Sequence, residues 1–463
     1  MNNLIKGAAV VALSCAATQT LSAKKMQQPN IVFLLIDDLG AMDLGCYGNR
    51  MSETPAINQL AQQSMRFTQA YASPVSSPTR TSIISGQNSA RHGVWEVIGC
   101  HDRPYARMQS PEFKEEIPEE IETYADILTG VGYDCAIFGK WHAGRTPEKE
   151  GFGGCNVEIK DPELKKHAKE NDIKQTGTIT AKSIEFMRAN VEQKKPFVLC
   201  VSHNLVHAPL EATKAMTDKY HAKMRKTGVI DMHPQYLSML EMVDESVDMV
   251  LSELDKLGIA DNTVVFLYGD NGALVSDMML VTPLASSTAP LRDQKGCLYE
   301  GGIRVPLIVR WPGKIEAGSE SDAPMMTYDL FSTFLEIGSG KVPAGQITDG
   351  ESLIPVLTQK ADKLKREAIY WHFPTNMWTR HPEGAIRKGD YKLIENYLDG
   401  SIQLYNVVAD IGETTDLAST NPELAKDLLE DLRAWRKDVG AGMPTPNPNY
   451  DPLRENEMAK DWW

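Results

Sequence analysis

Residues 31–38 read IVFLLIDD, six consecutive apolar residues followed at once by two aspartates. A continuous apolar run of this length is typical of a strand buried on both faces, as in a parallel sheet. Three further runs have the same character and also end in polar residues; they span residues 133–138, 196–201 and 263–268. These runs predict the central strands of one mostly parallel sheet.

Helical patterns lie between the runs, at residues 54–65 and 235–257. In the second pattern, apolar residues recur at helical spacing: Leu240, Val243, Val247, Leu251 and Leu254. Alternating strands and helices predict an α/β fold with a large, mostly parallel sheet sandwiched by helices. Ligands of such sheets bind beyond the carboxyl ends of the strands. The polar residues that follow the apolar runs are therefore expected to gather at one edge of the sheet.

The sequence changes character near residue 360, where a charged segment spans residues 359–366. Short alternating pieces follow, separated by Gly, Asp and Asn, and then a helical pattern at residues 422–439; the pieces span residues 368–371, 385–387, 391–395 and 403–406. They predict a small antiparallel sheet. We expect a catalytic domain over residues 24–364 and a smaller C-terminal α+β domain over residues 365–463.

The first residues have the pattern of a secretory signal peptide over residues 1–23. Lys6 precedes a short apolar stretch, and Leu21-Ser22-Ala23 fits a cleavage site. We expect export to the periplasm or beyond; a lipoprotein anchored through Cys15 is the alternative, although its cleavage box matches poorly. Past residue 24, no apolar run is long enough to span a bilayer.

The chain carries 48 Lys and Arg against 62 Asp and Glu, a formal net charge of −14. This acidic balance argues against a nucleic-acid partner, because proteins bind the negative phosphate backbone of nucleic acids with basic surfaces. If the substrate is an anion, the positive charge must be gathered locally in the site.

Two strand ends carry pairs of oxygen ligands, Asp37-Asp38 and Asp270-Asn271. Adjacent carboxylates at the end of a buried strand repel each other and are costly to desolvate, and a bound cation removes both problems. All-oxygen ligands suit a hard ion such as Ca²⁺ or Mg²⁺. The alternative is a solvated strand end with surface aspartates.

Cationic side chains also follow the apolar runs, and they are expected at the same edge of the sheet: Lys140, His142, His207 and Lys295. Together with Arg80 they would suit a tetrahedral oxyanion held between several donors and a divalent ion. Arg80 belongs to the stretch Ser76-Ser77-Pro78-Thr79-Arg80, which by itself would be an ordinary N-terminal helix cap.

Taken together, these motifs resemble the type I sulfatases of the alkaline-phosphatase superfamily, over essentially the whole mature chain. The motifs that carry the resemblance are Asp37-Asp38, Ser76-x-Pro-x-Arg80, Gly86, Arg91-His92-Gly93, Gly139-Lys140-Trp141-His142, His207-Ala208-Pro209, Asp270-Asn271-Gly272 and Lys295. The resemblance implies that Ser76 is oxidised to formylglycine (3-oxoalanine) by a separate maturase, as in bacterial members that have serine at this position.

The resemblance also implies the roles of the other residues. One Ca²⁺ would be held by residue 76 together with Asp37, Asp38, Asp270 and Asn271. Arg80 would steady the hydrated aldehyde, and His142 would assist its turnover. Sulfate and the leaving group would be contacted by Lys140, His207 and Lys295.

The chemistry explains why an aldehyde would be needed. A plain serine that attacked sulfur would end as a stable sulfate ester, and the enzyme would stop. A hydrated aldehyde carries two hydroxyls on one carbon, so one can attack sulfur and the other can lose a proton to re-form C=O and expel sulfate.

Two other functions remain open at this point. One is a phosphatase or phosphodiesterase of the same superfamily, because phosphate is nearly isosteric with sulfate. Such an enzyme would need Asp or His ligands for a second metal ion at the positions of Lys140, His207 and Lys295. The non-enzyme alternative is a glycan-binding protein with an unmatured site.

The resemblance to exported bacterial sulfatases implies a sulfated carbohydrate as substrate. Two segments mix aromatic rings with hydrogen-bond donors, and we expect them to contact the sugar. They span residues 95–103 and 370–381, and the predicted contacts are His101, Arg103, His372, Arg380 and His381.

Overall fold

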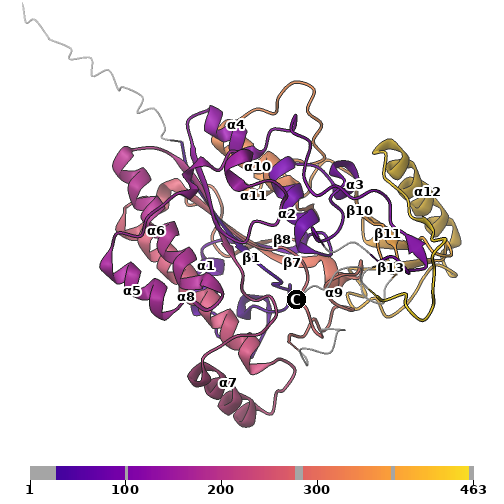
Figure 1. Cartoon of the computed structure of the whole chain (residues 1–463), viewed down its shortest axis with the longest axis horizontal. Coiled ribbons are helices and arrows are strands. Elements are labelled where there is room, and N and C mark those ends of the chain that lie inside the picture. Colours follow the sequence, from indigo (N-terminus) through magenta and orange to yellow (C-terminus); the bar gives the residue numbers. More distant parts are fainter. Residues whose placement is uncertain (1–27, 100–102, 277–284, 377–380, 458–463) are drawn as a thin grey trace, which may run out of the picture.

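The structure is a computed structural model that describes residues 28–99, 103–276, 285–376 and 381–457. Its main sheet has eight strands, drawn in Figure 1. Along the sheet they run β4 (Asp134–Gly139), β5 (Phe197–His203), β1 (Asn30–Ile36), β6 (Thr263–Gly269), β7 (Arg304–Arg310), β2 (Met65–Tyr71) and β8 (Ser319–Ser321), with β9 (Met325–Met326) also paired to β2. The predicted signal peptide, with Cys15, lies outside the described residues, as do His101 and Arg380.

The four predicted strands form one contiguous parallel block, β4-β5-β1-β6. The predicted α/β fold with a mostly parallel sheet is therefore confirmed. The run that ends at Ile36 is buried along its whole length. β7 is antiparallel to both β6 and β2. The sequence analysis did not predict β2 or β7, and Pro306 inside β7 interrupts the strand pattern there.

Helices cover both faces of the sheet (Figure 1). Alternate residues of β1 point to opposite faces, because side chains of a strand alternate. Phe33 and Leu35 lie in the core with α2 (Ser76–Ser85), α4 (Tyr124–Gly130), α10 (Asp329–Gly338) and α11 (Ile354–Leu357). Val32 and Leu34 lie in the core with α1 (Pro55–Gln62), α5 (Pro162–Glu170), α6 (Thr176–Gln193), α7 (Lys214–Thr227) and α8 (Pro234–Lys256).

A separate four-stranded antiparallel sheet forms in the C-terminal part, as predicted. Its strands are β10 (Ala368–Phe373), β11 (Glu383–Lys388), β12 (Tyr391–Asn396) and β13 (Ile402–Asn406), and α12 (Pro422–Asp438) packs on one of its faces. The short helices α3 (Ser89–His92) and α9 (Glu300–Ile303) and the strands β3 (Met108–Gln109) and β14 (Thr445–Pro446) complete the described elements, apart from single 3₁₀ turns.

The charged segment at residues 359–366 is anchored to the main domain at its end. Arg366 pairs with the buried carboxylate of Asp329 at 2.5 Å. The division of the chain at residue 364 remains a prediction. None of the helices in the described part of the chain combines the length and the apolarity that crossing a bilayer requires.

Candidate active site

The carboxylates of Asp37, Asp38 and Asp270 meet at the carboxyl ends of β1 and β6. One oxygen from each lies within 4.8 Å of the others, and all three residues are buried. The chain turns sharply here: Asp38 has a φ of 59°, an uncommon conformation for a residue other than glycine. Its amide nitrogen donates to Asp270 Oδ1 at 3.0 Å, which ties the two strand ends together.

This cluster fits a hard divalent cation. Asp38 Oδ2 is buried and has no hydrogen-bond partner in the described structure. Burial opposes ionisation of Asp38, but Lys295 and then His207 outweigh it, so the pKa of Asp38 lies below its ordinary value. The pKa of Asp37 is likewise held well below its usual range, because Lys140 and His207 outweigh the effect of burial. Ionised oxygen ligands in a buried cluster are what Ca²⁺ or Mg²⁺ prefers.

Ser76 is the first residue of α2 and faces this cluster. Its hydroxyl oxygen lies 3.1 Å from Asp37 Oδ1, 3.1 Å from Asn271 Oδ1 and 3.2 Å from Lys140 Nζ. Val75 before it is extended, and all ten residues of α2 are buried. The N-terminus of the helix favours negative charge that develops at this oxygen.

Two lysines contact the aspartates directly. Lys140 Nζ lies 2.8 and 2.7 Å from the two oxygens of Asp37, and Lys295 Nζ lies 2.5 Å from Asp38 Oδ1. The turn before Lys140 needs glycine: Gly139 has a φ of 105°, and a Cβ there would lie 1.9 Å from the Ser202 carbonyl oxygen.

Arg80 connects the aspartate cluster to the turn that carries Lys140. Its Nε donates to Asp270 Oδ2 at 2.9 Å, and Nη1 donates to the Lys140 carbonyl and to Ser202 Oγ, each at 2.7 Å. Ser202 itself donates to the same Lys140 carbonyl at 2.6 Å. Ser202 was not predicted as a site residue, although it directly follows the apolar run of β5 and its position there was the available signal.

Two histidines lie at the outer part of the cluster. His207 Nε2 is 3.8 Å from Asp38 Oδ2, and its side chain is 39% exposed. Burial, with Lys140 and Arg80 nearby, lowers the pKa of His142 to about 4, so its ring is neutral at pH 7. His142 Nδ1 is buried without a hydrogen-bond partner in the described structure. His207 Nδ1 lies 2.6 Å from the Ala208 carbonyl oxygen, so Nε2 is the ring nitrogen that is turned toward Asp38.

The two segments predicted to contact sugar meet each other near Ser76. The Ile98 nitrogen donates to Ser77 Oγ at 3.1 Å, so residues 95–99 are tied to the start of α2. Thr375 donates a hydrogen bond to the buried carboxylate of Glu96. Glu96 was not predicted from the sequence; burial raises its pKa to about 7.

His372 is buried, and both of its ring nitrogens have partners within the protein. It is 3% exposed, and its Nε2 hydrogen bonds with the Gly442 carbonyl at 2.8 Å while Nδ1 faces the Tyr397 hydroxyl at 2.9 Å. Since β10 turns this side chain inward, we correct the prediction and remove His372 from the sugar contacts. Arg103 is half-buried and His381 is exposed.

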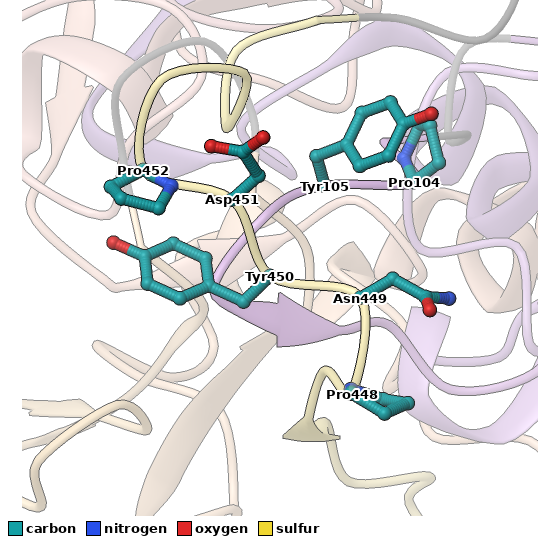
Figure 2. A pocket seen from close by; sticks show the side chains of 7 residues that line it. All are labelled: Pro104, Tyr105, Pro448, Asn449, Tyr450, Asp451 and Pro452. Atoms are coloured by element: carbon teal, nitrogen blue, oxygen red, sulfur yellow. The ribbon is translucent and has the colours of Figure 1, made fainter.

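An open hollow of about 580 Å³ begins at Pro104, directly after the first of the two segments that were predicted to contact sugar. Figure 2 shows its lining residues: Pro104, Tyr105, Pro448, Asn449, Tyr450, Asp451 and Pro452. Arg454 lies over the Tyr105 ring, 3.5 Å from its centroid. None of the predicted catalytic or metal residues belongs to this lining, so the hollow is distinct from the cluster around Ser76.

Comparison with known proteins points to one family. The family model described as Sulfatase matches residues 29–340, and the model described as N-sulphoglucosamine sulphohydrolase, C-terminal, matches residues 293–438. The chain is 30% identical to a protein named Sulfatase from Formosa agariphila, over 94% of each. It is also 30% identical to the N-acetylgalactosamine-6-sulfatase of Rattus norvegicus, over 81% of this chain and 73% of that one.

Solved structures show the same architecture. The chain superposes with a TM-score of 0.73 and 25% identity on Ps i-CgsB in complex with k-i-k-neocarrahexaose, covering 92% of this chain and 95% of the other. It also superposes with a TM-score of 0.63 on the phosphonate monoester hydrolase of Agrobacterium radiobacter, over 89% of this chain and 96% of the other, at 18% identity. The second likeness concerns the fold alone, and it shows that the fold by itself does not separate sulfur from phosphorus esters.

Proposed function

Since this chain belongs to the sulfatase family of the alkaline-phosphatase superfamily and is a sulfuric ester hydrolase, we propose that it removes sulfate from a glycan through a formylglycine made from Ser76 and one bound Ca²⁺. The observation that carries the proposal is the position of the Ser76 hydroxyl, within 3.1–3.2 Å of Asp37, Asn271 and Lys140. The ligands proposed for Ca²⁺ are Asp37, Asp38, Asp270, Asn271 and the modified residue 76.

Calcium and formylglycine would each supply one kind of chemistry. A calcium ion bound by these oxygens would acidify a neighbouring hydroxyl and polarise the sulfate oxygens. The hydrated aldehyde would offer one hydroxyl to accept the sulfuryl group and a second whose deprotonation releases it. Because serine must first be oxidised, we also propose that the protein depends on a formylglycine-generating maturase.

The residues of the chain would bind and orient the sulfate ester. Lys140 and Lys295 are cationic and lie beside the nucleophile, so they would contact sulfate oxygens. His207 lies at the exposed side of the cluster, where the leaving oxygen would depart, and would donate a proton to it. His142 is neutral at pH 7 and would accept the proton lost from the second hydroxyl. Arg80 would hold Asp270 and the Lys140 turn in place.

A two-metal phosphatase is the competing function on this fold. Its second ion would need carboxylate or imidazole ligands, but the neighbours of Asp37 and Asp38 here include the ammonium groups of Lys140 and Lys295. Two ammonium groups at that place argue against a second metal ion and favour a single-metal site for a sulfate ester. Elemental analysis of the purified protein is expected to give one divalent ion per chain, and two would favour the phosphatase.

The sulfated carbohydrate class is supported by the relatives. One relative is named for sulfated N-acetylgalactosamine, and the Ps i-CgsB structure holds a neocarrahexaose. We propose Arg103 and His381 as sugar contacts; His101 and Arg380 stay in the proposal on sequence grounds alone. We also propose that the chain is exported to the periplasm or beyond, on the signal-peptide pattern of residues 1–23.

Ser76→Ala tests the proposal. Turnover is expected to vanish while the thermal unfolding transition persists, because the proposed nucleophile is made from the Ser76 side chain. In the active wild-type protein, mass spectrometry of the peptide with Ser76 is expected to show a loss of about 2 Da, the two hydrogens removed on oxidation. Ser85→Ala, at the other end of α2, is the matched control and keeps activity. Substantial sulfate release by Ser76→Ala would refute the assignment.

A further inference from the structure

Lys295 lies on a loop, residues 292–302, which we call the Lys295 loop. The Gly301 nitrogen donates to the Arg292 carbonyl at 2.8 Å and closes the loop. The loop packs against the metal-ligand turn: Gly272 N donates to the Gly302 carbonyl at 2.9 Å, and Lys295 N donates to the Ala273 carbonyl at 3.0 Å. A Cβ at Gly272 would lie 2.0 Å from the Gly301 carbonyl oxygen. The backbone of the Lys295 loop is therefore in direct contact with the turn that carries Asp270 and Asn271.

The C-terminal sheet holds the other side of this loop. Leu298 N donates to Glu383 Oε1 of β11 at 2.9 Å, and the Tyr299 hydroxyl donates to Gln403 Oε1 of β13 at 2.5 Å. Arg292 donates to the Tyr405 hydroxyl of β13 at 2.8 Å. The loop is thus fixed between the metal-ligand turn and a sheet that contributes none of the proposed catalytic residues.

A buried charge cluster forms the centre of this contact. Lys392 Nζ of β12 lies 2.8 Å from Glu300 of the loop and 2.8 Å from Glu413, and all three side chains are fully buried. Glu413 Oε2 also accepts from the Glu300 backbone nitrogen at 2.8 Å. Tyr71 donates to the second oxygen of Glu300 at 2.8 Å. Lys392 therefore joins two carboxylates, that of Glu300 on the Lys295 loop and that of Glu413, which follows β13 in the chain.

We do not expect this buried ion cluster to add much to the free energy of unfolding. Taking three charges out of water costs about as much as their attraction returns, and apolar replacements of buried ion pairs are often neutral or stabilising. What a buried ion cluster can supply is a defined position for the segments that carry it. The segment positioned here is the Lys295 loop.

We propose that Lys392 and Glu413 are positioning residues that set where Lys295 meets the sulfate group. This inference rests on the role of Lys295 in the proposed function. The ammonium of a lysine sits on a flexible stem, so its place over Asp38 depends on where the backbone of the loop is held. A displacement of about 1 Å in a group that contacts the reacting centre can cost on the order of 100-fold in rate.

The test is the double variant Lys392→Met with Glu413→Gln. It removes one positive and one negative charge, and Glu300 keeps its contacts with Arg304 and Tyr71. Using an activated aryl sulfate, we expect kcat/KM to fall at least ~10-fold and the inhibition constant of inorganic sulfate to rise, with a cooperative unfolding transition retained. Lys388→Met is the matched control: this lysine lies on β11 of the same sheet, is 41% exposed and pairs with Asp431. It is expected to behave as wild type.

A double-mutant cycle with Lys295→Ala separates positioning from general damage. If Lys392 and Glu413 act through Lys295, adding their two substitutions to Lys295→Ala lowers kcat/KM by less than a further ~2-fold. A fully additive loss, or a folded double variant with wild-type kcat/KM, overturns the inference. If Lys295→Ala alone leaves kcat/KM unchanged, the proposed role of Lys295 is wrong and the inference is overturned with it. Should the double variant not fold, Tyr299→Phe, which removes only the bond to Gln403, is expected to give a smaller loss with the same non-additivity.

Discussion

The Arg80 guanidinium is buried near Ser76 and has three hydrogen-bond partners in different directions. It is 2% exposed and contacts Asp270, Ser202 and the Lys140 carbonyl at the same time. A planar fork can satisfy three acceptors that lie in different directions, whereas an ammonium on a flexible stem cannot. The shape of the guanidinium therefore matters at this position in addition to its charge.

Replacement of Arg80 by lysine tests this point. The variant keeps the charge but loses part of the fork, so Asp270 and the turn of Lys140 are no longer held together. We expect kcat to fall about 100-fold or more, a loss typical of removing one preorganised donor. Sulfate release and calcium content should be measured on the same preparation. A variant with near-wild-type kcat would show that charge alone is sufficient.

His372 is neutral in the folded protein for a physical reason. Burial lowers its pKa from 6.5 to about 4, and the hydrogen bond to Gly442 only partly opposes this. Between these values the unfolded chain binds a proton that the folded chain does not. The stabilisation by neutral His372 is therefore complete above pH 6.5 and is lost as the pH falls toward 4.

The variant His372→Gln removes this contribution. From pH 7.5 to pH 5, wild type is expected to lose about 2 kcal/mol more of its unfolding free energy than the variant, since each pKa unit corresponds to about 1.4 kcal/mol. Urea unfolding at both pH values measures this, and titrations at other groups cancel in the difference. Parallel pH profiles would contradict the prediction.

Among the elements, the two segments proposed for sugar binding form one unit. The bond from Thr375 to Glu96 and the bond from Asn376 Nδ2 to the Met108 carbonyl, at 2.7 Å, join the end of β10 to the chain around residues 96–108. Residues 95–99 are in turn tied to Ser77 of α2. A sugar held by this unit would therefore be held at a defined position relative to residue 76.

The proposed sugar contacts can be tested with the double variant Arg103→Ala and His381→Ala. We expect kcat/KM toward the natural sulfated glycan to fall about 10-fold, and toward a small aryl sulfate less than ~2-fold, because only the glycan reaches beyond the sulfate pocket. The same two residue types on α7, changed as His221→Ala and Arg225→Ala, provide the control. An unchanged ratio of the two substrates would exclude this pair as sugar contacts.

Across the whole molecule, the two sheets share part of their core. Tyr71 of β2 and Leu298 of the Lys295 loop pack with Trp371 of β10 and Tyr405 of β13. The segments around Ser76 and Lys295 are therefore joined to the C-terminal sheet through packed side chains as well as through Lys392.

Calcium removal is expected to separate activity from folding. The three carboxylates of the cluster have ion-pair partners on the chain itself, Lys140, Lys295 and Arg80, so we expect the fold to persist without the ion. With a chelator, turnover should vanish and return with added Ca²⁺. Saturating Ca²⁺ should stabilise the protein by about 3–4 kcal/mol, as expected for an ion present at ~100–1,000 times its dissociation constant. Asp270→Ala should lose the calcium-dependent shift in Tm; a full shift in this variant would contradict the proposed ligand set.

The sequence by itself determined the fold class and the composition of the cluster. Apolar runs such as residues 31–36 specify strands buried on both faces, and the carboxyl ends of parallel strands necessarily meet at one edge of a sheet. That is why Asp37, Asp270 and Lys140, although far apart in the chain, could be expected to lie together from the sequence alone.

Only the tertiary structure decided which side chains face inward and which distant segments support the site. His372 and His381 are both polar residues of one predicted segment, yet the first is buried on β10 and the second, beyond the end of that strand, is exposed. The bridge from Lys392 to Glu300 joins residues 92 positions apart, and neither lies in a motif that predicts the other. Local patterns encode periodicity and strand ends, whereas burial and long-range ion pairs depend on how the two sheets pack.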